Sequence, residues 1–190
     1  MADHSIILTG LPGCGKSTVG RQLGRRLQMP FVDTDHVIEQ RIGCSIRDYF
    51  AREGEDAFRE VEQSVLQDLC GRAEAHVIAT GGGIVLREAN RRCMQAAGTV
   101  VYLRSTVEEL ARRLRHDTQR PLLQGVDPLQ RLRDLYAARD PLYREVATFT
   151  IESARRSVAM MVGTVVMQIE LAGDGGALAA HGAAENTGGH

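Results

Sequence analysis

One glycine-rich segment near the amino terminus constrains this chain more than any other feature. Residues 10–17 read Gly-Leu-Pro-Gly-Cys-Gly-Lys-Ser and match the pattern G-x-x-x-x-G-K-[ST] at every fixed position. The apolar run at 5–9 predicts a buried strand before it, and apolar residues at four-residue spacing predict a helix over 17–27. A glycine-rich loop between a strand and a helix presents backbone N–H groups and the positive end of a helix dipole to an anion. The segment therefore predicts a site for the phosphate groups of a nucleotide.

Side chains of this loop carry further predictions. The chain has 23 lysine and arginine residues, and Lys16 is the only lysine among them. A position that keeps lysine against such a preference for arginine needs a compact ammonium, which here would reach the β- and γ-phosphates. The hydroxyl of Ser17 is a candidate ligand for Mg²⁺. Cys14 is either a spacer at an open position of the motif or a reactive thiol near a helix N-terminus, whose labelling would inactivate the protein. The loop residues expected to contact ATP are Gly13, Cys14, Gly15, Lys16, Ser17 and Thr18.

The composition is that of a globular protein of one domain. The chain has 190 residues, of which 43% are hydrophobic and 25% are charged. Its formal net charge of −1 argues against a surface built for nucleic acid or an anionic membrane, and no apolar run is long enough to span a bilayer. The N-terminus lacks the basic segment of a signal peptide, and the four cysteines lack metal-binding spacing. We therefore expect a cytoplasmic protein with reduced thiols and without nucleic-acid or membrane partners.

Short apolar runs alternate with amphipathic segments along the chain. This alternation predicts a three-layer α/β fold, in which helices flank a mostly parallel five-stranded sheet within one domain, 1–172. The other strands are expected at 31–33, 77–79, 99–103 and 147–152, and the other helices from 35, over 45–70 with a break at Gly54, and over 87–97, 107–114, 128–139 and 158–171. Residues 116–127 lack a clean period and predict a mobile loop, and the Gly- and Ala-rich end at 173–190 predicts a disordered tail.

Asp33 and Asp35 are the candidate acids next to the phosphate loop. The third expected strand ends in Thr-Gly-Gly-Gly at 80–83 and not in an acid, and the chain has no N-K-x-D run for guanine recognition. Two residues apart on an extended segment, the side chains of Asp33 and Asp35 would point the same way. At the carboxyl end of a strand both would face one region for Mg²⁺ and a phosphate acceptor. The alternative is a turn or a helix N-cap, where aspartate is common.

Over about residues 5–172 the chain resembles the shikimate kinase family. The resemblance rests on several motifs in the same order. These are 10–18, Asp33-Thr34-Asp35, Gly54-Glu55-x-x-Phe58-Arg59-x-x-Glu62, Gly81-Gly82-Gly83, Arg120-Pro121-Leu122-Leu123 and Arg139-x-Pro141-Leu142-Tyr143. Many nucleotide-binding enzymes share the phosphate loop, whereas the combination of the other five motifs is specific.

The resemblance implies a site for shikimate, a triply hydroxylated ring acid. It assigns the carboxylate of shikimate to Arg59 and Arg139, because a planar guanidinium group suits a carboxylate. From the residues alone, Arg59 would be an exposed helix arginine that pairs with Glu55 or Glu62, and Arg139 a cation at a helix C-terminus.

The same resemblance assigns the chemistry and the acceptor loop. Asp35 would accept hydrogen bonds from ring hydroxyls, including the one that is phosphorylated, and could take its proton. Asp33 would hold Mg²⁺ through water. Backbone N–H groups of the loop would approach the ring substituents, since three consecutive glycines allow close approach; the alternative is a plain flexible turn. These loop residues are Gly81, Gly82 and Gly83.

The segment at about 114–127 corresponds to the lid of this family, which places Arg120 on the phosphates and excludes water. The alternative for Arg120 is a solvated loop arginine. The acceptor-binding part would cover about 33–61. Arg113 and Arg156 would flank the adenine, although Val158 stands where many relatives carry a proline beside this base.

These observations predict an ATP:shikimate 3-phosphotransferase, the kinase step in the synthesis of aromatic amino-acid precursors. Its catalytic residues would be Lys16, Asp35 and Arg120, its cofactor Mg²⁺, and its oligomeric state a monomer. Two alternatives remain open. One is another small-molecule kinase of similar fold, of the gluconate or nucleoside monophosphate type. The other is a domain that binds ATP without catalysis and serves regulation or partner binding.

Overall fold

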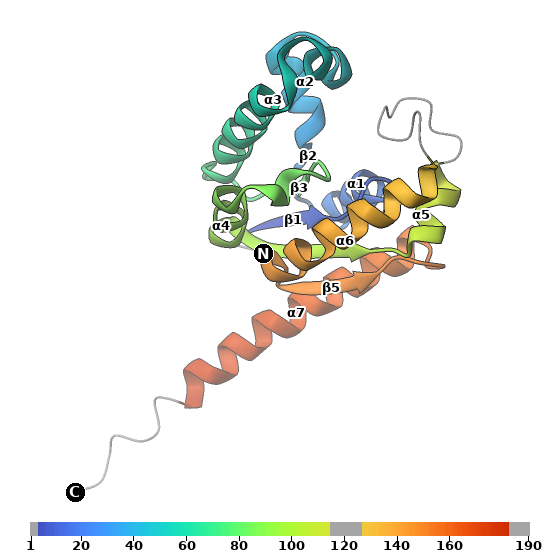
Figure 1. The fold of residues 1–190 in the computed structure, drawn as a ribbon. Helices are drawn as coiled ribbons and strands as arrows, with labels where there is room; N and C mark the ends of the chain where they lie inside the picture. Colours follow the sequence, from blue (N-terminus) through green and yellow to red (C-terminus); the bar gives the residue numbers. More distant parts are fainter. Residues whose placement is uncertain (1–3, 115–126, 183–190) are drawn as a thin grey trace, which may run out of the picture.

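Five strands form one parallel sheet in the computed structural model, which describes residues 4–114 and 127–182. The strands are β1 (Ser5–Thr9), β2 (Phe31–Asp33), β3 (Val77–Ala79), β4 (Gly98–Arg104) and β5 (Phe149–Glu152), in the order β2-β3-β1-β4-β5 (Figure 1). Each neighbouring pair of these strands is parallel, so the expected sheet is confirmed.

Helices cover both faces of this sheet (Figure 1). They are α1 (Lys16–Leu27), α2 (Thr34–Ile42), α3 (Ile46–Cys70), α4 (Glu88–Ala97), α5 (Val107–Leu114), α6 (Pro128–Val146) and α7 (Val158–Gly182), with a short 3₁₀ turn at Ile84–Leu86. Helix α1 contacts α7, α4 contacts α6, and α2 packs on α3 at one end of the sheet. All five residues of β1 are buried, as is typical of a central strand covered on both faces. Among the described residues, no helix is both long and apolar enough to cross a membrane.

The register of the strands brings three loops to one edge of the sheet. Leu8 of β1 and Asp33 of β2 both align with Ala79 of β3. The carboxyl ends of these three neighbouring strands are therefore nearly level with one another. The segments that follow the strands lie side by side at this edge of the sheet. In open α/β sheets, ligands bind outside this carboxyl edge.

Two helices, α3 and α6, can be compared with the bounds expected from the sequence. The expected break in α3 is confirmed, because Gly54 is non-helical with a φ of 85°. Helix α6 was expected to end at residue 139 but continues to Val146 with Pro141 inside it. The buried side chains of Tyr143 and Val146 stabilise this extension and offset the backbone hydrogen bond that proline removes.

The last helix also extends beyond its expected end. We expected a helix to 171 and a disordered tail over 173–190, whereas α7 continues to Gly182. The alanines in this stretch favour a helix, and their preference outweighs that of the glycines against it. Residues 183–190 lie outside the described residues, as do 115–126, which contain most of the expected lid.

Candidate active site

Glycines give the loop after β1 its shape. Gly10, Gly13 and Gly15 have φ angles of 144°, 85° and 98°, a range that favours glycine. A Cβ atom on Gly10 would also lie 2.6 Å from the carbonyl oxygen of Leu103. Gly15 is the N-cap of α1, and this helix has no side-chain cap and no acidic residue in its first turn. The N-terminus of α1 is thus open to an anion.

The ammonium group of Lys16 lies at this loop. Its Nζ donates hydrogen bonds to the carbonyl oxygens of Gly10 at 2.8 Å and Leu11 at 3.1 Å. The ammonium group is therefore held against the backbone of the loop that precedes α1. Thr18, in the first turn of the same helix, is exposed.

Cys14 is part of the core and not of the loop surface. Its side chain is 0% exposed, and its Sγ lies 3.7 Å from Nζ of Lys16. A thiol reagent cannot reach this sulfur in the folded protein, so the structure contradicts the reactive alternative and favours a spacer.

Ser17 and Asp33 form a direct contact between α1 and the end of β2. Ser17 Oγ donates a hydrogen bond to Asp33 Oδ2 at 2.5 Å. The other carboxylate oxygen of Asp33 accepts from the backbone N–H of Asp35 at 3.0 Å and caps α2. Asp33 is therefore a helix N-cap and a partner of the phosphate loop at once. The expectation that Asp33 and Asp35 share an extended segment is wrong, because α2 begins at Thr34.

Asp35 instead lies against the glycine loop that follows β3. The backbone N–H of Gly81 donates to Oγ1 of Thr34 at 3.0 Å, which ties this loop to α2. A Cβ atom on Gly81 would lie 2.8 Å from Oδ1 of Asp35 and 3.2 Å from Oε1 of Glu62. The two carboxylates thus approach the same point, and only glycine leaves them room there.

Helix α3 brings Arg59 to the same loop. Its guanidinium group pairs with Glu62 at 2.7 Å and Glu55 at 3.2 Å, so the ion pairs read from the helix spacing are confirmed. A Cβ atom on Gly83 would overlap this guanidinium group. The ion pairs therefore hold Arg59 directly against the glycine loop.

Arg139, on α6, also reaches the glycine loop. Its side chain is only 8% exposed, and its Nη1 lies 3.5 Å from the position that a Cβ atom on Gly82 would take. The alternative of a cation at a helix C-terminus is wrong, because α6 continues for two further turns to Val146. Pro12 of the phosphate loop lies next to Gly82 as well. A buried arginine at this loop needs an anionic partner.

Glu62 is a site residue to which the sequence interpretation gave no role beyond its pairing with Arg59. It is 2% exposed, and burial raises the pKa of its carboxyl group. Arg59 and, more weakly, Arg139 oppose this rise, whereas Asp35 adds to it. Glu62 therefore interacts electrostatically with Arg59, with Arg139 and with Asp35 of α2.

We expect Glu62→Gln to change how stability depends on pH. Because the folded-state pKa of Glu62 is raised, its contribution to stability is complete below the unfolded-state pKa and is lost as pH rises through the folded-state value. The difference in Tm, wild type minus variant, should therefore fall as pH rises across this interval. Thermal unfolding of both proteins from pH 4 to 8 measures it, with Glu55→Gln as the exposed control. A difference that grows with pH would contradict the direction of the shift.

Tyr143 is hydrogen-bonded to the backbone of the glycine loop. This buried side chain donates a hydrogen bond from its hydroxyl to the carbonyl oxygen of Gly82 at 2.5 Å. Its ring stacks on Tyr102 of β4 with centroids 4.9 Å apart, and Tyr102 in turn donates to Asp140 at 2.8 Å. The last sequence motif contained Tyr143 but gave no signal for this contact.

Tyr143→Phe should lower the free energy of unfolding by about 1 kcal/mol, because the carbonyl of Gly82 loses its hydrogen-bond donor. Denaturant unfolding measures this change. Tyr102→Phe is the matched control, since it removes a hydroxyl from the same stacked pair without touching the loop. If only Tyr143→Phe also raised the acceptor KM, the hydrogen bond would position the loop; equal KM values would limit it to stability.

The remaining predicted arginines differ in their settings. Arg113 on α5 pairs with Glu109 at 2.9 Å and donates to the carbonyl oxygens of Gly13 at 3.3 Å and Ser153 at 3.4 Å. It therefore joins the phosphate loop to the segment after β5. Arg156 lies in that segment and is exposed. Arg120 lies outside the described residues.

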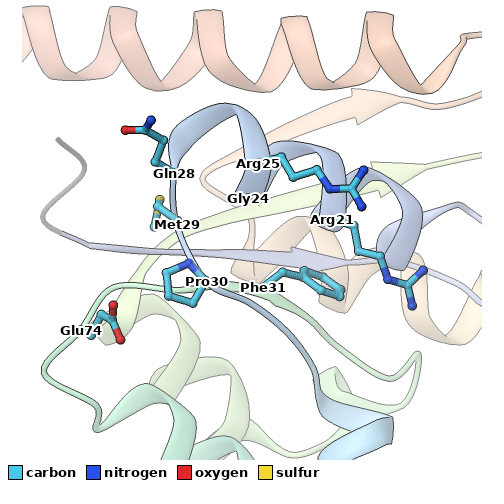
Figure 2. Close-up of a pocket in the computed structure, with 8 residues that line it drawn as sticks. All are labelled: Arg21, Gly24, Arg25, Gln28, Met29, Pro30, Phe31 and Glu74. Atoms are coloured by element: carbon cyan, nitrogen blue, oxygen red, sulfur yellow. The ribbon is translucent and has the colours of Figure 1, made fainter.

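A surface hollow at the other end of α1 is separate from this site. Figure 2 shows this hollow where α1 ends and the chain continues into β2. The guanidinium carbon of Arg21 lies 5.6 Å from the centroid of the Phe31 ring. None of the predicted site residues lines it. Lys16, Asp35 and Gly81, by contrast, follow β1, β2 and β3 at the carboxyl edge of the sheet.

Comparison with known proteins agrees with this geometry. A family model described as shikimate kinase matches residues 12–170. A shikimate kinase of Paracidovorax citrulli is 57% identical over 171 residues, which cover 89% of this chain and 93% of that protein. One of Cupriavidus pinatubonensis is 50% identical over 169 residues, 89% of this chain and 88% of that one. A shikimate kinase of Acinetobacter baumannii, solved in complex with shikimate, superposes with a TM-score of 0.84 at 44% identity and covers 87% of this chain and 92% of that one.

The matched span contains the phosphate-loop lysine, both aspartates, the glycine loop and the two arginines that flank it. By sequence and by fold, this chain belongs to the shikimate kinase family.

Proposed function

We propose that this protein transfers the γ-phosphoryl group of Mg-ATP to the 3-hydroxyl of shikimate and forms shikimate 3-phosphate and ADP, a step in the synthesis of aromatic amino-acid precursors. The observation that supports this function best is the arrangement around the glycine loop. Arg59 and Arg139 flank it, Asp35 borders it, and Pro12 of the phosphate loop touches it. The complex of the A. baumannii relative with shikimate supports the same acceptor.

Arg59 and Arg139 would bind the carboxylate of the acceptor. A guanidinium group is planar and binds a carboxylate with two parallel hydrogen bonds. Glu62 and Glu55 neutralise part of the charge of Arg59 and orient it. Because Gly81, Gly82 and Gly83 carry no side chains, Asp35, Pro12 and Arg59 can approach the backbone of this loop closely.

Asp35 would act on the hydroxyl that receives the phosphoryl group. In the proposed reaction this oxygen attacks the γ-phosphorus, its proton passes to the carboxylate of Asp35, and ADP leaves with the bonding electrons. The transition state of phosphoryl transfer is loose, so a strong base is not required and position accounts for much of the rate.

The phosphate loop would hold ATP from the other side. Lys16 would contact the β- and γ-phosphates, and the backbone of the loop with Thr18 would surround the phosphate chain. The contact between Ser17 and Asp33 offers hydroxyl and carboxylate oxygens, which suit Mg²⁺. Among residues 4–114 and 127–182, no group of three or more His, Cys, Asp or Glu side chains could hold a metal. Phosphate oxygens and water would therefore complete the coordination. Bound there, Mg²⁺ would neutralise charge on the phosphates.

The other elements of the proposal follow from family membership. Arg113 and Arg156 would flank the adenine, and Arg120 would close over the phosphates as part of a lid at about 114–127. The acceptor-binding part would cover about 33–61. We propose further that the protein is a monomer in the cytoplasm.

A coupled assay of ADP release from Mg-ATP tests this function. We expect rapid release with shikimate and only background release with gluconate, CMP or no acceptor. Release with another acceptor would retain the phosphate loop but overturn the roles of Arg59 and Arg139. ATP binding without release for any acceptor would favour a non-catalytic domain.

A further inference from the structure

Two consecutive residues of α4 hold the 3₁₀ turn that follows the glycine loop. Asn90 donates a hydrogen bond from Nδ2 to the carbonyl oxygen of Ile84 at 3.0 Å. Arg91 donates from Nη1 to the carbonyl oxygen of Val85 at 2.8 Å. Asn90 is 1% exposed, and the side chain of Arg91 is 13% exposed. The first two carbonyl groups of this turn are therefore fixed by side chains that are largely shielded from water.

Arg91 also joins the turn to α6. Its Nε pairs with the carboxylate of Glu145 at 2.9 Å, and Gln95 of α4 donates to the backbone carbonyl of Glu145 at 3.3 Å. Tyr143, on the same helix α6, donates to the carbonyl oxygen of Gly82. The glycine loop and the turn after it are thus hydrogen-bonded to α4 and α6, and these two helices are bonded to each other.

The turn in its own right orients the peptide groups of the glycine loop. The N–H of Ile84 donates to the carbonyl oxygen of Gly81 at 3.2 Å. A trans peptide group is planar, so its N–H points away from its C=O. Because the turn holds the carbonyl of Gly81, the N–H of Gly82 faces the opposite side. In the same way, Tyr143 holds the carbonyl of Gly82 and so directs the N–H of Gly83.

We propose that Asn90 and Arg91 are positioning residues for the phosphate acceptor. The inference rests on the proposed function, in which backbone N–H groups of the glycine loop approach the ring substituents of the acceptor. Neither side chain has to touch the acceptor, because both act through the turn. They fix the carbonyls of Ile84 and Val85, and the turn then sets the direction of the N–H groups in the loop.

An unpaired oxygen on Asn90 supports this role. Among the residues that the structure describes, no group donates a hydrogen bond to its buried Oδ1. A buried acceptor without a partner lowers stability, and a leucine of similar shape would not carry this cost. The presence of asparagine at this position therefore indicates a requirement for its Nδ2 donor.

Steady-state kinetics of Asn90→Leu and Arg91→Met tests the proposal. We expect each variant to raise the KM for shikimate about tenfold, the effect of one hydrogen bond, and to change the KM for ATP less than about twofold. Arg91→Lys replaces the fork with a single ammonium group, so its KM for shikimate should lie between those of the wild type and Arg91→Met. Arg92→Met removes an exposed cation from the same helix and should leave both KM values unchanged. Equal increases in the two KM values, or an unchanged KM for shikimate in both variants, would overturn the proposal.

Hydrogen–deuterium exchange gives a readout that does not depend on kinase activity. Without substrates, the amides of residues 81–86 should exchange about tenfold faster in Asn90→Leu and Arg91→Met than in the wild type, because the turn opens more often. The amides of residues 10–17 should keep their wild-type rates. Unchanged exchange across 81–86 would overturn the proposal even if the protein phosphorylates shikimate. Faster exchange in a protein that does not phosphorylate shikimate would support the hold of α4 on the loop and overturn only the proposed function.

Discussion

Lys16→Met is expected to lower kcat by about 10³-fold or more, because it removes the point charge that would stabilise the phosphates in the transition state. Methionine is also unbranched, but it lacks the terminal ammonium group and donates no hydrogen bond. In the structure the ammonium group of Lys16 is held by two backbone carbonyls of the loop, so its position is set before a nucleotide arrives. A group that is already in place costs little to position at the moment of reaction.

Two variants separate this effect from a general loss of charge or structure. Lys16→Arg keeps the charge but replaces a compact ammonium with a planar fork, so we expect it to remain severely impaired. Arg25→Met removes an exposed cation from the last turn of the same helix and should leave kcat unchanged. Single-turnover kinetics at saturating Mg-ATP, with a parallel titration of ATP binding, makes the measurement. Near-normal turnover of Lys16→Met would refute its role at the phosphates.

The phosphate side of the site was predictable because its signal is local. The glycines, Lys16 and Ser17 lie within eight consecutive residues, and their backbone conformation follows from the glycine pattern itself. The parallel sheet was predictable for a related reason, since alternating strands and helices leave few other topologies. Family resemblance then proposed the acceptor residues one by one, and the structure brings Asp35, Arg59 and Arg139 to one glycine loop.

The relations among these residues were not predictable, because they depend on contacts between distant elements. The burial of Arg139 follows from the continuation of α6 through Pro141, which local propensity opposes. The roles of Glu62 and Tyr143 depend on α3 and α6 meeting the same loop. The two aspartates diverge because Asp33 caps α2, and a single hydrogen bond to the backbone of Asp35 decides this geometry.

Arg139→Ala is expected to raise the KM for shikimate by about 10²-fold or more, because loss of one member of a buried charge pair costs several kcal/mol. The KM for ATP should change far less, since Arg139 meets the loop at Gly82 and not the glycines of the phosphate loop. Removal of this cation also removes one of the charges that oppose the raised pKa of Glu62. We therefore expect the acceptor KM of the variant to depend more strongly on pH than that of the wild type.

Arg144→Ala is the matched control for this prediction. Arg144 lies on the same helix, is exposed, and pairs with Asp140 at 2.7 Å, so its loss changes the charge of α6 without opening the site. Arg139→Lys tests geometry separately, because lysine keeps the charge and most of the volume but cannot bind a carboxylate with a planar fork. If Arg139→Lys recovers the fold but not the acceptor KM, the guanidinium group itself is required. Equal increases in both KM values for Arg139→Ala would mean that Arg139 acts through the structure of the loop, and that the carboxylate of the acceptor binds elsewhere.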